Sequence, residues 1–284
     1  MSEAVLAAPP PQARRIGVLP GFGLTLGMTV AWLSLIVVLP LAALVARPWE
    51  LGLGGVWEAL TQPRVLAALR LSFGMALAAA AVNLPLGLLL SWVLVRYRFP
   101  GRAAIDAMID LPFALPTAVA GITLTTLYGP RGWLGAPLAA LGIKVAYTPL
   151  GILAALVFVG LPFVVRTVEP VLRAFPHEAE ESAETLGARP WQTARRVILP
   201  AVIPALLTGF GLAFARAVGE YGSVIFIAGN MPMVSEITPL LIVIKLQEFD
   251  YAGASVLGLA MLAGATLCLA AIGMLRRRLS PLHE

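Results

Sequence analysis

Residues 180–200 read EESAETLGARPWQTARRVILP, a stretch rich in glutamate and arginine, with a glycine near its centre and a proline at its end. On both sides of this stretch the chain is strongly apolar. A charged side chain at the centre of a bilayer costs about 2.5 to 3.5 kcal/mol on insertion scales. We therefore expect residues 180–200 to lie in water, between two segments that cross a membrane.

The composition indicates an integral membrane protein. Of the 284 residues, 59% are hydrophobic and 12% are charged, and the mean hydropathy is +0.89. Soluble domains carry roughly 25% charged residues. The net charge of +5 does not indicate a nucleic-acid partner, because the basic residues lie beside the apolar segments, where they act as orientation signals. The single cysteine, Cys268, can form no intrachain disulfide and receives no chemical role.

Six apolar segments are long enough to cross about 30 Å of hydrocarbon, which takes about 20 helical residues. The predicted fold class is therefore an all-α integral membrane protein with six transmembrane helices, flanked by tails at 1–21 and 276–284. The first segment exceeds the usual 7 to 15 apolar residues of a signal core, so we expect it to be retained. The six segments are 22–46, 65–95, 104–128, 149–172, 200–227 and 252–275.

The distribution of arginines predicts the orientation of these helices. Cytoplasmic loops carry an excess of Lys and Arg, and the arginines concentrate in the two tails and in every second loop, including the loop 173–199. Both termini and the loop 173–199 are therefore predicted to be cytoplasmic, in a multi-pass protein of the bilayer.

The loop 173–199 has the pattern of two short helices joined by a tight turn. Pro176 suits the start of a helix whose narrow apolar stripe is formed by Ala179, Ala183 and Leu186. Gly187 then suits a left-handed helix end, and a second helix follows from Pro190. Such a unit is too short to have its own core. It either lies on its own helix bundle or docks on another protein.

This loop resembles the cytoplasmic EAA loop of ABC importer permeases. The matching residues are Glu181, Ala183, Gly187, Leu199 and Pro200. Two positions depart from the pattern, Ser182 in place of alanine and Val197 in place of isoleucine, and both changes preserve the apolar stripe. The resemblance implies that the loop is a coupling helix, which fits a groove on a separate ATPase subunit and transmits its opening and closing.

A wider resemblance covers nearly the whole chain apart from the N-terminal tail, and it is to the T-type subunit of the sulfate/thiosulfate branch of these permeases. Molybdate permeases share part of the fourth motif and remain an alternative, as molybdate/tungstate carriers. The motifs are RYRFPGR (96–102), DLPFALPTAVAG (110–121), LPFVVRTVEPVL (161–172), VGEYGSVIFIAGN (218–230) and LQEFDY (246–251).

The resemblance implies a type I (MetI-like) importer permease fold over 65–275, in a bacterial inner membrane. It implies as partners a W-type second permease, two ATPase subunits and a periplasmic sulfate- or thiosulfate-binding protein. The chain itself has no phosphate-binding loop, because its only lysines, Lys144 and Lys245, lie outside any G-x-x-x-x-G-K-[ST] pattern. We expect it to bind no cofactor, with ATP and magnesium held by the partner ATPases, and to be no enzyme itself.

One charged group lies within the fifth predicted helix. Arg216 precedes Glu220 by one helical turn, and Tyr221 and Ser223 add hydroxyl groups nearby. In one interpretation Arg216 and Glu220 form an internal ion pair. In the other, Arg216 attracts a divalent oxyanion and the two hydroxyls donate hydrogen bonds to it, so that these four residues line the translocation pathway.

Two further arginines in helices, Arg70 and Arg166, are predicted to be anchors near the membrane surfaces. Asp106 and Asp110 share a face of the third helix, and we expect them to pair with arginines such as Arg98 or Arg102.

Pro112, Pro116 and Gly121 interrupt the third predicted helix, which makes them candidate bending positions in the wall of the pathway. Close packing of small residues explains the same glycine equally well.

Two other functional classes remain open. A single-chain transporter coupled to an ion gradient would need no partner ATPase. An intramembrane enzyme is disfavoured, because HEAEE at His177 lacks the second histidine of H-E-x-x-H and no G-x-S-x-G occurs. The sequence predicts neither catalytic residues nor a metal site.

Overall fold

The computed structural model describes residues 21–279, and within that range every regular element is helical. In chain order the elements are α1 (Phe22–Leu33), η1 (Ser34–Val38), α2 (Leu39–Ala46), η2 (Arg47–Leu51), α3 (Gly52–Thr61), α4 (Pro63–Arg96), α5 (Arg102–Ile109), α6 (Leu111–Ala114), α7 (Thr117–Tyr128), α8 (Gly135–Ala140), α9 (Pro149–Ala174), α10 (His177–Thr185), α11 (Pro190–Thr193), η3 (Ala194–Ile198), α12 (Leu199–Val218), α13 (Val224–Ile227), α14 (Thr238–Gln247) and α15 (Tyr251–Leu279).

The chain divides into two units, of which the first ends at Ala46. Its described part is a run of helix, α1 to α2, in which no residue is buried. The π-helical turn η1 ends directly before Leu39 and Pro40. A proline ring clashes with the carbonyl group four residues earlier in a regular helix, and the wider π-helical turn relieves that clash.

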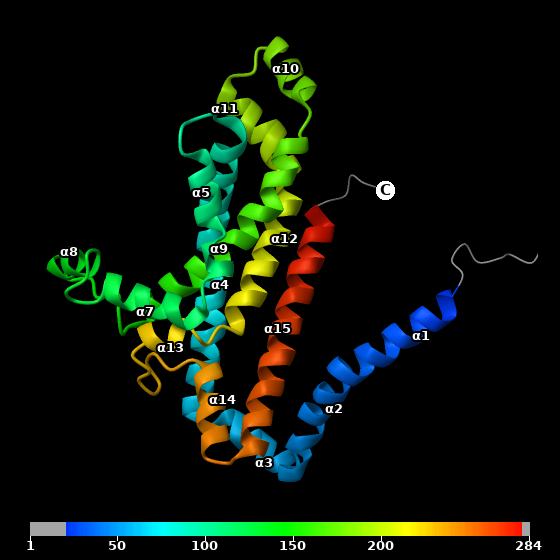
Figure 1. The fold of residues 1–284 in the computed structure, drawn as a ribbon, viewed down its shortest axis with the longest axis vertical. Coiled ribbons are helices and arrows are strands. Elements are labelled where there is room, and N and C mark those ends of the chain that lie inside the picture. Colours follow the sequence, from blue (N-terminus) through cyan, green and yellow to red (C-terminus); the bar gives the residue numbers. More distant parts are fainter. Residues whose placement is uncertain (1–20, 280–284) are drawn as a thin grey trace, which may run out of the picture. The chain divides into compact units, whose positions relative to one another are not determined.

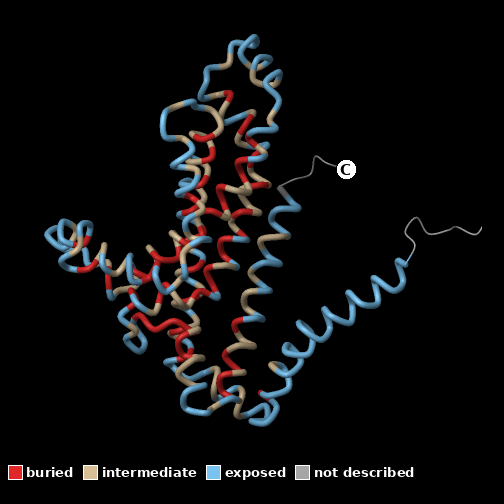
Figure 2. Tube along the Cα trace, in the orientation of Figure 1, coloured by how far each residue is buried: buried red, intermediate tan, exposed pale blue. Residues whose placement is uncertain are grey.

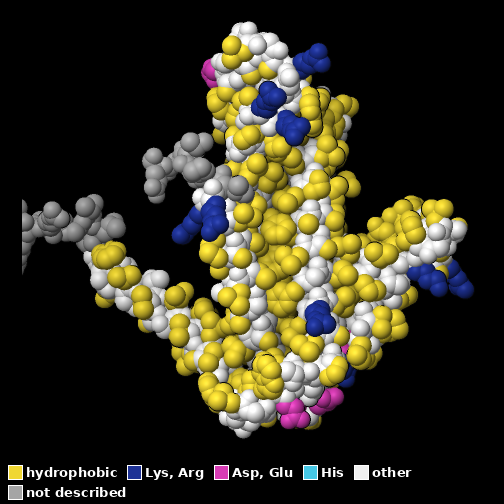
Figure 3. Space-filling model, turned by 180° about the vertical axis from the view of Figure 1, so that it is seen from behind, with side chains coloured by type: hydrophobic (Ala, Val, Ile, Leu, Met, Phe, Trp, Pro, Cys, Tyr) yellow, Lys and Arg dark blue, Asp and Glu magenta, His cyan; other side chains and the backbone are white. Residues whose placement is uncertain are grey.

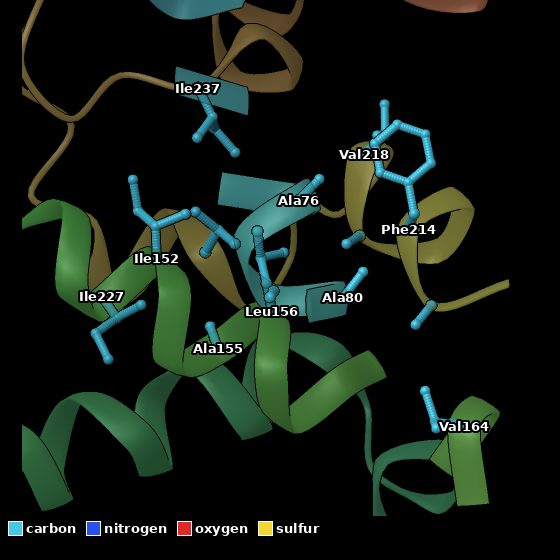
Figure 4. Close-up of a cluster of buried hydrophobic side chains, with 14 of the residues drawn as sticks. Ala76, Ala80, Ile152, Ala155, Leu156, Val164, Phe214, Val218, Ile227 and Ile237 are labelled. Atoms are coloured by element: carbon cyan, nitrogen blue, oxygen red, sulfur yellow. The ribbon is translucent and has the colours of Figure 1, made fainter. Parts of the chain in front are cut away.

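The second unit, Arg47–Glu284, is built around the three helices α4, α9 and α12. These helices pack on one another, and α15 packs against α12 and α14 (Figure 1). Buried residues follow the inner faces of the three helices (Figure 2). The core is apolar and contains many small side chains; Figure 4 labels Ala76, Ala80, Ile152, Ala155, Leu156, Val164, Phe214, Val218, Ile227 and Ile237.

The outer surface of this bundle is also apolar. On the face that Figure 3 shows, hydrophobic side chains cover most of the middle of the bundle, and charged side chains lie mostly toward its ends. Five helical stretches are long and apolar enough to cross a membrane, namely Phe22–Thr61, Pro63–Arg96, Pro149–Ala174, Pro190–Val218 and Tyr251–Arg278. This distribution is what a bilayer requires of the protein that it surrounds.

Two of the six predicted segments differ from the observed helices. The third segment, 104–128, is divided into α5, α6 and α7, with breaks at Asp110 and at Leu115–Pro116. The second break has a clear cause, because Pro116 disfavours helical geometry at the residue before it. The fifth segment, 200–227, ends as a continuous helix at Val218, since the chain turns at 219–223 before α13.

Glycines allow the three central helices to approach closely. A Cβ atom on Gly87 of α4 would lie 2.5 Å from Val164 Cγ1, and one on Gly209 of α12 would lie 2.9 Å from Val164 Cα. Val164 of α9 is fully buried between them. Small residues at such contacts are typical of membrane helices, where packing drives association.

We expect Gly209→Ala to destabilise the protein by about 1 to 3 kcal/mol, the usual cost of overpacking a filled core. The added methyl group meets the backbone of α9, which cannot rotate away. The matched control is Gly211→Ala in the same helix, whose new Cβ would lie 3.6 Å from Ile272 Cγ2, an ordinary contact. The midpoint of thermal unfolding in detergent checks the prediction, and equal midpoints for the two variants would contradict it.

Candidate functional site: the 173–199 loop and the charged groups of the bundle

The loop 173–199 forms a helical elbow at one end of the second unit, where α10 and α11 lie together (Figure 1). Gly187 occupies the turn with a φ of 80°. Its backbone N–H donates to Glu184 O (2.8 Å), and the N–H of Ala188 donates to Ala183 O (3.0 Å). These two bonds form a Schellman motif, which satisfies the last carbonyl groups of α10 and reverses the chain direction.

The second arm of the elbow begins at once after the turn. Pro190 occupies the first turn of α11, and the side-chain oxygen of Gln192 accepts a hydrogen bond from the backbone N–H of Arg189 (2.8 Å). The arm continues through the π-helical turn η3, which ends directly before Leu199 and Pro200. The same Leu-Pro sequence follows η1, so the proline explains both π-helical turns.

The elbow exposes apolar side chains. Leu186 is 89% exposed and Trp191 is 71% exposed, whereas Ala183 is half-buried. No residue of α10 is buried. Glu181 and the turn residue Gly187 are also exposed. The elbow thus presents an exposed leucine and an exposed tryptophan within a polar loop.

An ion pair joins the elbow to α4. Arg96, the last residue of α4, donates to Glu180 of α10 at 2.5 Å, and the two side chains are 16% and 22% exposed. The Arg96 guanidinium also lies 5.5 Å from the ring centroid of Trp92. Sequence reasoning missed this contact, because 84 residues separate the partners and Arg96 reads as an orientation signal.

The four candidate pathway residues lie at the end of α12 and in the turn after it. Arg216 forms an ion pair with Glu220, whose side chain is 2% exposed. Glu220 also accepts hydrogen bonds from the backbone N–H and the hydroxyl of Ser223, both at 2.9 Å. Tyr221 is half-buried. The charge of Arg216 and the hydroxyl of Ser223 are thus both engaged by one carboxylate, as the ion-pair interpretation expects.

A small cavity of about 10 Å³ borders Glu220 and Ser72. A cavity needs at least about 10 to 15 Å³ on this measure to hold one water molecule. In this conformation the cavity between Glu220 and Ser72 therefore has no room for an oxyanion.

The candidate bending positions lie at the breaks of the third segment and on the helix that follows them. Pro112 is in α6, and Pro116 precedes α7. A Cβ on Gly121 would lie 2.4 Å from the backbone oxygen of Ser223, so α7 packs closely on the turn that holds Glu220. Close packing therefore requires a glycine at position 121, in addition to any role of this residue in bending.

Arg166 of α9 binds the carboxylates of the third segment, which corrects two expectations. Its guanidinium donates to Asp106 (2.7 Å) and Asp110 (2.6 Å), and also to Glu169 (2.9 Å) of its own helix. No ion pair in the described range involves Arg98 or Arg102. The predicted partners of Asp106 and Asp110 were therefore wrong. Arg166 joins α5 and α6 to α9, and it is not a surface anchor.

We expect Arg166→Gln to destabilise the protein by about 1.5 to 3 kcal/mol, the usual value for a hydrogen bond to a charged group. Glu169 keeps Arg173 as a partner (2.5 Å), but Asp106 and Asp110 lose theirs. The control is Arg98→Gln, which breaks no ion pair. Thermal unfolding in detergent measures the difference, and an equal loss in the two variants would contradict this role for Arg166.

Within residues 21–279 no group of three or more His, Cys, Asp or Glu side chains could hold a metal ion. The geometry of the second unit is instead that of a helix bundle with one exposed, sharply turned elbow and several ion pairs in which a buried carboxylate meets a partly exposed arginine.

Comparison with known proteins identifies this arrangement. Residues 83–281 match the family model described as the binding-protein-dependent transport system inner membrane component. The sulfate transport system permease protein CysT of Escherichia coli (strain K12) is 49% identical over 92% of this chain and 94% of its own length. The protein of the same name from Synechocystis sp. is 45% identical over 95% of both chains.

Solved structures agree on the fold. A chain of a bacterial alginate ABC transporter, crystallised with an alginate pentasaccharide-bound periplasmic protein, superposes with a TM-score of 0.76. The superposition covers 91% of this chain and 94% of that chain at 16% identity. The predictions of an all-helical ABC permease fold and of a permease function are confirmed. The chain belongs to the family of binding-protein-dependent transport system inner membrane components, the multi-pass inner-membrane permeases of ABC importers.

Proposed function

We propose that this permease carries sulfate into the cytoplasm. The observation that carries the proposal is the identity of 45 to 49% with sulfate transport permeases along more than nine-tenths of the chain. The resemblance in the five motifs between Arg96 and Tyr251 supports the same substrate. Thiosulfate, a divalent oxyanion of similar shape, is included in the proposal, whereas molybdate and tungstate are the alternative that the test must separate.

We further propose that the elbow docks on an ATPase subunit. The Schellman turn at Gly187 fixes the angle between its two arms, and Leu186 and Trp191 present apolar surface to a partner. The complex would contain a W-type second permease, two ATPase subunits that hold ATP and magnesium, and a periplasmic binding protein. Closure of the ATPase pair would draw the elbows of the two permeases together and open the translocation pathway to the outside. Hydrolysis of ATP would reverse this change.

In this scheme the chain supplies geometry and no bond chemistry. Glu181, Ala183 and Gly187 shape the elbow, and Leu199 and Pro200 carry its second arm into α12. Arg216, Glu220, Tyr221 and Ser223 are proposed to face the pathway in the open conformation, in which the Arg216–Glu220 pair is rearranged. Pro112, Pro116 and Gly121 are proposed to allow the movement of α6 and α7.

Uptake of radiolabelled sulfate tests the substrate. A strain that lacks its own sulfate permease is complemented with this chain and its partner subunits, and excess molybdate is added as competitor. We expect uptake that depends on the chain and resists molybdate. Inhibition by the excess molybdate would favour the alternative, and uptake by the purified chain alone in vesicles would indicate an ion-coupled transporter.

A further inference from the structure

Each end of α4 is joined by an ion pair to a segment distant in sequence. At its last residue, Arg96 pairs with Glu180 of the elbow. Near its first residue, Arg64 donates two hydrogen bonds to Glu236, of 2.8 and 2.7 Å. The Glu236 side chain is 1% exposed. A bidentate bond from arginine to a carboxylate fixes orientation as well as distance, so the Arg64–Glu236 joint is defined in direction, whereas the Arg96–Glu180 joint is a single hydrogen bond of 2.5 Å.

α4 is long enough to reach across the bilayer between the two joints. It is a single helix of 34 residues with one internal proline, Pro85. At 1.5 Å per residue, the rise from Arg64 to Arg96 is about 48 Å. The helix packs along α9 and α12. In Figure 1, α10 and α14 lie at opposite ends of the bundle that contains α4.

At the elbow end of α4, the Arg96–Glu180 ion pair connects the elbow to a helix outside it. α10 packs against α11 and η3, which belong to the same elbow, and has no buried residue of its own. Glu180 is the residue of α10 that an ion pair ties to α4. A displacement of the elbow therefore acts directly on the end of α4.

At the outer end, Glu236 belongs to a segment that is firmly attached to α4 on one side and exposed on the other. The Ser72 hydroxyl of α4 accepts a hydrogen bond from the backbone N–H of Thr238 (2.8 Å), about two helical turns along α4 from the Arg64 contact. A few residues earlier, Met231, Met233 and Val234 are 49 to 61% exposed. Movement of α4 would therefore shift the outer segment 231–238, in which residues 231–234 are exposed and residues 235–238 are buried.

We propose that α4 is the rod that transmits displacement of the cytoplasmic elbow to the outer segment 231–238, with Arg96–Glu180 and Arg64–Glu236 as its two joints. The inference rests on the proposed docking of the elbow on an ATPase, and it holds whichever anion is carried. Arg96 and Arg64 are positioning residues, because they act through the segments that they hold.

The test compares Arg96→Gln, Arg64→Gln and the double variant in the complete reconstituted complex. Because the joints act in series, we expect each single variant to lower ATP-driven uptake about tenfold, within the range of allosteric coupling. ATP hydrolysis should persist, since the elbow still docks. The double variant should be no worse than either single one, whereas independent structural defects would add. Exchange of the charges, Arg96→Glu with Glu180→Arg, should restore uptake.

A second readout does not depend on the solute. Met233→Cys is introduced with Cys268→Ala, and its labelling by an impermeant maleimide is followed with and without nucleotide trapping. We expect trapping to change the labelling rate in the parent and to lose that effect in Arg96→Gln.

The control is Lys245→Gln, which breaks an ion pair of 2.8 Å between residues only five apart. That pair and the Gly253 N–H lower the pKa of the Asp250 carboxyl, and none of these residues takes part in the two joints of α4. We expect this variant to behave as the parent.

If nucleotide trapping still changes the labelling rate in Arg96→Gln, or if the losses of uptake add in the double variant, the proposal that α4 transmits the displacement is overturned. If the parent takes up no sulfate but nucleotide trapping still changes its labelling rate, only the assignment of sulfate as the substrate is overturned.

Discussion

The variant Gly187→Asp is expected to lose ATP-driven uptake almost completely while it still accumulates in the membrane. The φ of 80° at this position is left-handed, a conformation that costs most other residues about 1 to 2 kcal/mol. Asp adopts this conformation less readily than Gly, so the angle between the arms is weakened. The new carboxylate also stands beside Leu186, in the surface that is proposed to enter the ATPase. Uptake in vesicles and the amount of inserted chain are the two measurements.

A matched control separates these effects from backbone strain. Gly142, in the loop after α8, has a φ of 79°, and a Cβ there would meet nothing within 4 Å, as at Gly187. Gly142→Asp therefore imposes the same strain far along the chain from the elbow. We expect its uptake to stay near that of the parent. Normal uptake by Gly187→Asp, or equal losses in the two variants, would count against docking through the elbow.

The second large effect is expected for Arg216→Ala. This change leaves the carboxylate of Glu220, 2% exposed, without its ion-pair partner. Removing one partner of a buried pair costs about 3 to 5 kcal/mol, because an uncompensated charge stays buried. We therefore expect a severe loss of folded protein in detergent, measured by size-exclusion chromatography, and little uptake from what remains.

The double variant Arg216→Ala with Glu220→Gln distinguishes the two interpretations of this pair. The neutral amide removes the unpaired charge, and its oxygen can still accept a hydrogen bond from Ser223. We expect the folded yield to recover. If Arg216 attracts the anion in the open conformation, sulfate uptake stays low despite that recovery. Uptake that returns together with the yield would assign Arg216 a structural role alone.

The sequence was a good guide to the membrane helices that begin at a proline and to the elbow. α9 begins at Pro149, where Thr148 accepts a hydrogen bond from the N–H of Leu150 (3.3 Å), and the segment predicted from hydropathy began at the same residue. In the elbow, one glycine between two short helical patterns was enough to predict the turn, because few residues other than glycine adopt a φ of 80° easily.

Contacts between distant segments could not be predicted in the same way. Asp106 and Asp110 have arginines close by in sequence, yet their partner is Arg166, 56 residues after Asp110. The position of the fifth helix end was missed as well, because the residues 224–227 are as apolar as the helix before them. Hydropathy reports which residues avoid water, and it does not report which helix faces which.

The pairing of Asp106 and Asp110 with Arg166 has a consequence for biosynthesis. A ribosome adds about 5 to 20 residues per second, so Arg166 emerges roughly 3 to 11 seconds after Asp110. During that interval both carboxylates lack the counter-ion that they have in the finished protein. The ion pairs that join α5 and α6 to α9 can therefore form only after α9 has been synthesised.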